Sequence, residues 1–175
     1  RSHTIVTENW IHPDRENLPW EVCGEASRNL SEQIVESGWF PDLIVGVARG
    51  GLIPAGAIGY AIGVKAMGAI NVEFYTDIGQ TLDEPIILSP QLDTDSLKGK
   101  KVLVVDDVAD SGKTLDLVVN LLKETADDVR SAVIYTKPKT IFEPDFSWKK
   151  TDQWINFAWS VLPVITADGS FKEGS

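Results

Sequence analysis

The chain has 175 residues, of which 43% are hydrophobic and 24% are charged, so it is long enough for one compact domain with a substantial core. Its 16 basic and 26 acidic residues give a formal net charge of -10, which disfavours binding to nucleic acid or to an anionic membrane. A single cysteine, Cys23, excludes an internal disulfide and a cysteine-based zinc site. The sequence has no apolar run near the ~20 residues of a membrane span and no apolar signal-peptide core, so we expect a cytoplasmic protein.

The first half of the chain predicts alternating helices and strands. Apolar residues at helical spacing over residues 19–37 predict a helix that buries one face, and Gly38 ends it. The short apolar run 42–48 predicts a buried strand, and a glycine turn then leads into a close-packed helix over 51–63. A strand-like pattern follows over 64–75. This alternation is typical of parallel βαβ units.

The second half begins with a turn-rich stretch, residues 76–99, which is too long for an ordinary connection. A strand over 100–106, a helix over 111–125 and a strand over 129–136 then predict a second βαβ unit. Beyond residue 136 we expect short strands and loops, and we expect the tail, residues 167–175, to be frayed.

The segment that carries chemistry is VLVVDDVADSGKTL, residues 102–115. Its strand delivers Asp106 and Asp107 to the carboxyl end, where ligands bind in open α/β sheets. The following loop offers hydroxyls, a glycine and the unpaired N–H groups of a helix N-terminus, which together make an anion site. The Gly112-Lys113-Thr114 ending is similar to a P-loop, but that motif requires a glycine where Asp107 stands, so we do not expect a nucleoside triphosphatase.

A monophosphate site beside two carboxylates suits a sugar phosphate, because carboxylates accept hydrogen bonds from vicinal hydroxyls and can orient Mg²⁺. A second anion site follows the strand that ends near Val47. There, Ala48-Arg49-Gly50-Gly51 places an arginine among small residues, where it can clamp a pyrophosphate.

Residues 102–115 resemble the binding signature of type I phosphoribosyltransferases, which has four apolar residues, two acids and a D-S/T-G-x-T phosphate loop. The resemblance implies that Asp106 and Asp107 hold the ribose diol of phosphoribosyl pyrophosphate, with Asp107 as the contact to Mg²⁺ or its water. It also implies that Asp110 acts as the general base. The residues that it assigns to the 5′-phosphate are Asp110, Ser111, Gly112, Lys113 and Thr114.

The same resemblance assigns the pyrophosphate to Arg49 and Gly50. Purine members of the family carry a non-proline cis peptide in this loop, which maps to Ala48-Arg49. They also keep a lysine for the exocyclic oxygen of 6-oxopurines, and Lys137 stands at that position. The segment around Trp154 and Ile155 resembles the hood of bacterial xanthine-guanine phosphoribosyltransferases, in which an aromatic and an aliphatic residue cover the purine.

The resemblance covers about residues 39–159 and implies the type I phosphoribosyltransferase fold. This is an α/β fold: a single domain, here residues 1–175, with a mostly parallel central sheet flanked by helices and a small C-terminal hood. We expect the core over about 39–136, the hood over about 137–166 and a mobile lid over about 75–88. The lid is acidic and has neither Lys nor Arg, so it is poorly suited to contact pyrophosphate.

These features predict an enzyme that transfers a phosphoribosyl group to xanthine, guanine or hypoxanthine, as a homo-oligomer, either a dimer or a tetramer. Alternatives remain: orotate, uracil or adenine as the base, or a non-catalytic protein that senses phosphoribosyl pyrophosphate. A nucleic-acid-binding regulator is disfavoured by the charge and the lack of a basic stripe. A signalling receiver domain would need the Asp106-Asp107 strand near its start and a lone phospho-acceptor Asp after a later strand, and the sequence has neither.

Overall fold

The computed structural model describes residues 10–73, 76–77, 80–81, 86–87 and 93–173. The helices are α1 (Trp20–Glu36), α2 (Leu52–Ile62), α3 (Lys113–Lys123) and the 3₁₀ helix η1 (Thr94–Leu97). The strands are β1 (Glu16–Leu18), β2 (Leu43–Ala48), β3 (Met67–Glu73), β4 (Thr76–Asp77), β5 (Gln80–Thr81), β6 (Ile86–Ile87), β7 (Lys101–Ala109), β8 (Asp128–Thr136), β9 (Phe146–Lys150), β10 (Ile155–Phe157), β11 (Val164–Ile165) and β12 (Phe171–Lys172).

The chain divides into two compact units, one formed by residues 24–151 and one by the described parts of 1–23 and 152–175. Of the predicted hood, residues 137–151 belong to the larger unit and 152–166 to the smaller. Among the described residues, no helix is both long and apolar enough to cross a membrane.

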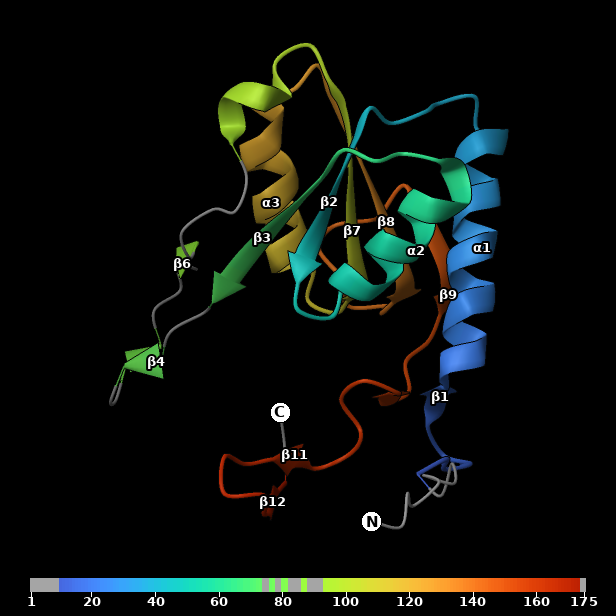
Figure 1. Cartoon of the computed structure of the whole chain (residues 1–175), viewed down its shortest axis with the longest axis vertical. Helices are drawn as coiled ribbons and strands as arrows, with labels where there is room; N and C mark the ends of the chain where they lie inside the picture. Colours follow the sequence, from blue (N-terminus) through green and yellow to red (C-terminus); the bar gives the residue numbers. More distant parts are fainter. Residues whose placement is uncertain (1–9, 74–75, 78–79, 82–85, 88–92, 174–175) are drawn as a thin grey trace. The chain divides into compact units, whose positions relative to one another are not determined.

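The larger unit is built on one sheet with the strand order β6-β3-β2-β7-β8-β9 (Figure 1). Five of these strands, β3, β2, β7, β8 and β9, run parallel, and β6 pairs antiparallel with β3 at one edge. The predicted α/β fold with a mostly parallel sheet is therefore confirmed. The sequence gives little sign of β9, because only Phe146 in it is buried and the strand has no apolar run.

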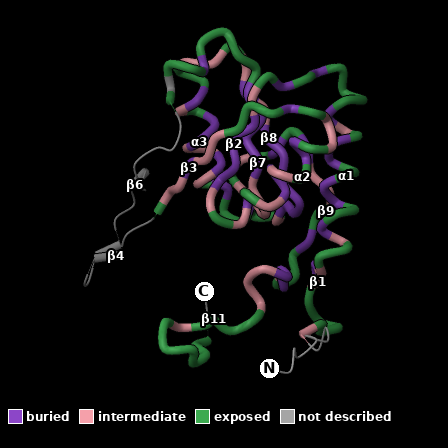
Figure 2. The backbone as a smooth tube through the Cα atoms, viewed as in Figure 1, coloured by how far each residue is buried: buried purple, intermediate pink, exposed green. Residues whose placement is uncertain are grey.

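Helices cover both faces of this sheet, with α3 on one face and α1 and α2 on the other (Figure 1). Successive side chains of β7 point to opposite faces of the sheet. Val102 and Val104 point to the face covered by α3, where they pack in one cluster with the apolar side of that helix. On the other face, Gly46 of β2 lies directly beneath Leu52 of α2. Because both faces are covered, the central strands are buried along most of their length (Figure 2).

Strand β7 continues three residues beyond its predicted end. It pairs with β8 as far as Ala109, which lies opposite Thr136. Asp106 and Asp107 therefore lie within the last residues of the strand, where backbone pairing holds them, and the loop to α3 begins after Ala109.

The predicted lid, residues 75–88, is largely outside the described residues, including Tyr75, Asp83 and Glu84. Within its bounds, β4 and β5 form a short antiparallel pair that places Thr76 opposite Thr81.

In the smaller unit, β1 pairs in parallel with β10. The tail was expected to be frayed, and this expectation is wrong for residues up to 172: β11 and β12 form an antiparallel hairpin. Its turn is closed by Asp168, which accepts hydrogen bonds from the hydroxyls of Thr166 (2.5 Å) and Ser170 (2.7 Å) and from the Ser170 amide (2.9 Å). Such side-chain bonds to nearby groups are typical of aspartate in turns.

Candidate active site

Three segments with predicted roles meet at one edge of the larger unit's sheet. Strands β2, β7 and β8 are parallel neighbours, so their carboxyl ends lie at the same edge. The segments that follow or end these strands contain Arg49, the pair Asp106 and Asp107, and Lys137. This is the edge at which open α/β sheets bind ligands.

The loop after β2 contains a cis peptide bond between Ala48 and Arg49, as the resemblance predicted. Its backbone then turns tightly into α2, because the Gly51 amide donates to the Val47 carbonyl at 2.9 Å. The Arg49 side chain is exposed. A guanidinium exposed at this edge is available to an anionic ligand.

Gly50 lies against the Asp107 carboxylate. A Cβ atom on Gly50 would overlap Asp107 Oδ2, so no larger residue fits without moving that side chain. The other oxygen, Asp107 Oδ1, accepts the Val108 amide at 2.8 Å. The predicted pyrophosphate loop and the predicted metal-contacting carboxylate are therefore in direct contact.

Asp106 occupies a different environment from its neighbour. Its Oδ1 accepts the Asp107 amide at 2.8 Å. Burial raises the pKa of the Asp106 carboxyl well above its usual value, and the negative charge of Asp107 raises it further. The pair thus repel each other in a partly buried position, and cationic or hydroxyl-bearing ligands would relieve this repulsion.

The predicted phosphate loop connects β7 to α3. Gly112 is the N-cap residue of α3, with φ of 82° in the left-handed region, and it has no side chain to cap the helix. Ser111 Oγ accepts the Lys113 amide at 3.3 Å, the first amide of the helix. A hollow of about 80 Å³ lies there. The described residues that line it are Asp106, Val108, Ala109, Asp110, Ser111, Gly112, Thr114 and Leu115. A small hollow at a helix N-terminus suits a phosphate group.

The loop between β8 and β9, residues 137–145, packs on the phosphate loop. Lys137 donates its backbone N–H to the Ala109 carbonyl at 3.0 Å, and Ile141 donates to Ser111 at 2.8 Å. A Cβ on Gly112 would collide with Thr140 Oγ1, so Gly112 is required by both its backbone angle and its neighbour. The backbone of Lys137 is thereby held beside the phosphate loop.

Asp110, the predicted general base, is an exposed residue in the phosphate loop. Its Oδ1 lies 3.1 Å from the Nζ of Lys139 on the β8–β9 loop. The sequence analysis did not single out Lys139 or Thr140, and their contacts depend on two loops that lie side by side only in the folded sheet.

Trp154 and Ile155, the predicted hood residues, belong to the smaller unit. Trp154 is 71% exposed, and its carbonyl accepts the Glu16 amide at 2.9 Å. Trp159 instead stacks on Phe157, with ring centroids 4.9 Å apart, so it packs with its neighbours. The exposure of Trp154 leaves its ring available to a ligand, whereas Ile155 is half-buried.

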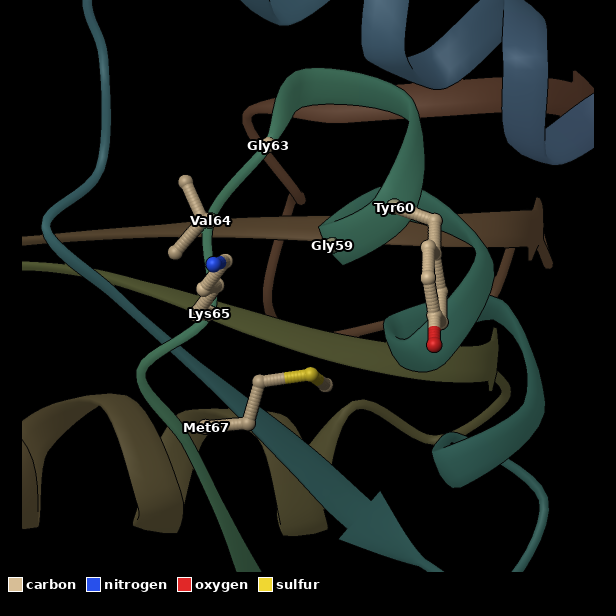
Figure 3. Close-up of a pocket in the computed structure, with 6 residues that line it drawn as sticks. All are labelled: Gly59, Tyr60, Gly63, Val64, Lys65 and Met67. Atoms are coloured by element: carbon tan, nitrogen blue, oxygen red, sulfur yellow. The ribbon is translucent and has the colours of Figure 1, made fainter.

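A larger hollow, about 390 Å³, lies at the opposite edge of the sheet, where α2 ends and β3 begins (Figure 3). Tyr60, Lys65 and Met67 project around it, and its other described lining residues are Gly59, Gly63 and Val64. Its described lining contains no carboxylate and a single cation, so it lacks the groups expected for the chemistry of a sugar phosphate.

The sequence profile of the phosphoribosyl transferase domain matches residues 19–164. The xanthine-guanine phosphoribosyltransferase of Cereibacter sphaeroides is 30% identical over 159 residues, which cover 89% of this chain and 86% of that protein. The enzyme of the same name from Gluconobacter oxydans is 32% identical over 159 residues, which cover 90% of this chain and 91% of that protein. The crystal structure of a purine phosphoribosyltransferase from Pyrococcus horikoshii Ot3 is similar with a TM-score of 0.74 and 37% identity, over 87% of this chain and 99% of that one. The chain thus belongs to the phosphoribosyl transferase domain family.

Proposed function

We propose that this protein transfers the 5-phosphoribosyl group from phosphoribosyl pyrophosphate to a 6-oxopurine, either xanthine, guanine or hypoxanthine, and releases pyrophosphate. One observation carries the proposal: the hollow at the α3 N-terminus is lined by Asp106 and by the phosphate loop, and the loop that carries Lys137 is hydrogen-bonded to that phosphate loop. The names of the similar proteins from Cereibacter sphaeroides and Gluconobacter oxydans support a purine as the acceptor.

The donor would bind across two loops. The amides at the start of α3, with Ser111 and Thr114, would hold the 5′-phosphate, because the helix N-terminus presents N–H donors and a favourable dipole. Lys113 would add positive charge beside them. Arg49 and Gly50 would hold the pyrophosphate, the arginine by paired hydrogen bonds and the glycine by letting the ligand approach the backbone.

The pair Asp106 and Asp107 would accept hydrogen bonds from the ribose hydroxyls. Their mutual repulsion also fits Mg²⁺, with Asp107 as the contact to the ion or its water. Among the described residues, no cluster of three or more His, Cys, Asp or Glu side chains forms a metal site. When bound, Mg²⁺ would supply positive charge to the leaving pyrophosphate.

The bond that forms joins a purine nitrogen to the anomeric carbon, and the bond that breaks joins this carbon to pyrophosphate. Positive charge develops on the ribose, and the purine must lose a proton. Asp110 would accept this proton, a role that contributes ~100 to 10,000-fold when the geometry is right. Arg49 would stabilise the negative charge that builds up on pyrophosphate.

Lys137 would donate to the exocyclic oxygen of the base, while Trp154 and Ile155 would cover its ring. Stacking an aromatic side chain on a base contributes about 1 to 3 kcal/mol and tolerates different bases. Selectivity for 6-oxopurines would therefore come from Lys137. We further propose that the protein acts in the cytoplasm, in purine salvage, as a homodimer or homotetramer.

A turnover panel tests the acceptor. Purified protein with phosphoribosyl pyrophosphate and Mg²⁺ is offered xanthine, guanine, hypoxanthine, adenine, orotate and uracil, and pyrophosphate release is followed. We expect release with 6-oxopurines. Release only with adenine, orotate or uracil would assign another base, and donor binding without release with any base would favour a non-catalytic sensor.

Lys137→Ala tests how the base is selected. We expect a loss of about tenfold or more in kcat/KM for 6-oxopurines, since a charged hydrogen bond is worth ~1.5 to 3 kcal/mol, with little change in any residual activity on adenine. An equal loss on both kinds of base would contradict the role given to Lys137.

A further inference from the structure

The β8–β9 loop and the phosphate loop hold each other in place. Two backbone hydrogen bonds join them, from Lys137 to Ala109 and from Ile141 to Ser111. Thr140 Oγ1 also occupies the space beside Gly112, and it is fixed there because it donates to the Phe142 carbonyl at 2.9 Å. A side chain on one loop can therefore set the orientation of a side chain on the other.

Lys139 lies on this fixed loop and contacts Asp110. Its Nζ is 3.1 Å from Asp110 Oδ1, and the two side chains are 70% and 58% exposed. An ion pair this exposed contributes at most about 1 kcal/mol to stability. Among the described contacts, Asp110 Oδ2 accepts no hydrogen bond, so the pair engages one carboxylate oxygen and leaves the other to a ligand.

We propose that Lys139 is a positioning residue for the proton transfer: it holds Oδ1 of Asp110 and thereby directs Oδ2 to the purine proton. The inference rests on the proposed function, in which Asp110 is the general base. It concerns orientation, because a 1 Å displacement of a reacting group can cost about 100-fold in rate.

The chain offers a matched control for this contact. Lys150 Nζ lies 3.3 Å from Glu143 Oε1, and those side chains are 73% and 65% exposed. The two pairs therefore have the same chemistry and nearly the same exposure, but neither Lys150 nor Glu143 has a proposed role in the reaction.

The test compares Lys139→Met, Lys139→Arg and Lys150→Met in the full chain, with kcat and KM measured for donor and base. Lys139→Met should lower kcat by about 3- to 10-fold with KM for the donor nearly unchanged, since only the orientation of the base is lost. Lys139→Arg should restore at least half of the wild-type kcat. Lys150→Met should stay within about twofold, as surface substitutions usually do.

A double-mutant cycle asks whether Lys139 acts through Asp110. Asp110→Asn should remove most turnover, and adding Lys139→Met should then cause no further loss in the residual rate. An additive loss, a rise in kcat on Lys139→Met, or equal effects of Lys139→Met and Lys150→Met would each overturn the inference and leave the proposed function standing. A wild-type protein that releases no pyrophosphate with any base would overturn both.

Discussion

Asp106 and Asp107 are sequence neighbours in different surroundings. The Asp106 carboxyl is partly buried, and its pKa is raised first by burial and then by the negative charge of Asp107. Its Oδ1 accepts the Asp107 amide. Asp107 instead has one oxygen on the Val108 amide and the other against the backbone of Gly50. The two acids therefore face different neighbours: Asp107 contacts Gly50 on the loop after β2, and Asp106 lines the hollow at the start of α3.

Gly50→Ala tests the contact between the pyrophosphate loop and Asp107. The new Cβ would overlap Asp107 Oδ2, so the carboxylate must move away from its present place. Overpacking of this kind costs about 1 to 3 kcal/mol. We expect kcat/KM for phosphoribosyl pyrophosphate to fall by roughly 10- to 100-fold, because ~1.4 kcal/mol corresponds to a factor of ten.

Gly56→Ala is the matched control. Gly56 lies inside α2, and a Cβ there would meet nothing within 4 Å. Alanine favours a helix interior over glycine by about 0.5 to 1 kcal/mol, so this variant should be slightly more stable and fully active. Full activity of Gly50→Ala would show that Asp107 does not depend on the close approach of the glycine.

At the scale of elements, the sequence predicts what one continuous segment contains. The apolar run of β7, its two acids and the start of α3 form such a segment, and the fold class was predicted from a succession of such segments. The cis peptide at Ala48-Arg49 was predicted only from the family resemblance. The contact of Thr140 with Gly112 and the pair Lys139-Asp110 could not be predicted, because they depend on how loops from different strands pack. Lys139 and Asp110 are both exposed, and exposed charged residues follow no periodic pattern from which a contact could be predicted.

The C-terminal hairpin did have a local signal. Asp168-Gly169 is a residue pair that favours hairpin turns, and it lies between Val164-Ile165 and Phe171-Lys172. The structure forms the turn there, with φ of 84° at Gly169. The prediction failed because each strand has only two residues, which is too short for an alternation of polar and apolar residues to be visible.

Gly112→Ala tests the junction of the phosphate loop and the β8–β9 loop. The residue must adopt a φ of 82°, which costs a side chain about 1 to 2 kcal/mol, and its Cβ would also collide with Thr140 Oγ1 and approach the Phe142 amide at 2.8 Å. We expect chemical denaturation to show a loss of stability greater than the backbone cost alone. Turnover should fall with it, because both loops must shift.

Gly99→Ala separates the cost of the positive φ from the cost of the collision with Thr140. Gly99 also has a positive φ, 71°, but a Cβ there would meet nothing within 4 Å. It should lose only the backbone cost of about 1 to 2 kcal/mol. If both variants lost the same stability and Gly112→Ala kept its turnover, the packing of Thr140 on Gly112 would be of no consequence.

The Asp168 turn makes a prediction for acid solutions. Hydrogen bonds from Thr166 and then from Ser170 lower the pKa of Asp168 to about 2, from 3.8. Because the folded pKa is depressed, the contribution of these bonds is present above about pH 4 and is lost as the pH falls through about 2. A ¹³C titration of the carboxyl group should show this midpoint, and Thr166→Ala should move it upwards. An unchanged midpoint in Thr166→Ala would mean that the hydroxyl does not stabilise the charge.

At the scale of the whole molecule, an acidic protein is proposed to bind a highly charged anion. The net charge is -10, yet the segments at the carboxyl edge of the sheet contain Arg49, Lys113 and Lys137. Local amides and cations set the field that a bound phosphate experiences, and distant surface charges are screened within about 8 to 10 Å at ordinary salt. Net charge therefore limits nucleic-acid binding without excluding this substrate.

The thermal stability of the protein should increase when phosphoribosyl pyrophosphate binds. A ligand that binds only the folded state at 100 times its Kd stabilises it by about 2.7 kcal/mol. For a chain of this length, phosphoribosyl pyrophosphate with Mg²⁺ should raise the Tm by roughly 5 to 10 °C. Replacing both site acids, Asp106→Asn with Asp107→Asn, should abolish the shift. The unliganded variant should be no less stable than the wild type, because the repulsion between the two carboxylates is removed.

The control replaces Glu124→Gln and Asp127→Asn, which changes the net charge equally at the far end of α3, where both residues are exposed. This variant should keep the full shift in Tm, measured by calorimetry at the same ligand concentrations. If the variant at Asp106 and Asp107 kept the shift as well, the donor would bind without the acid pair, and the site proposed at the carboxyl edge of the sheet would be wrong.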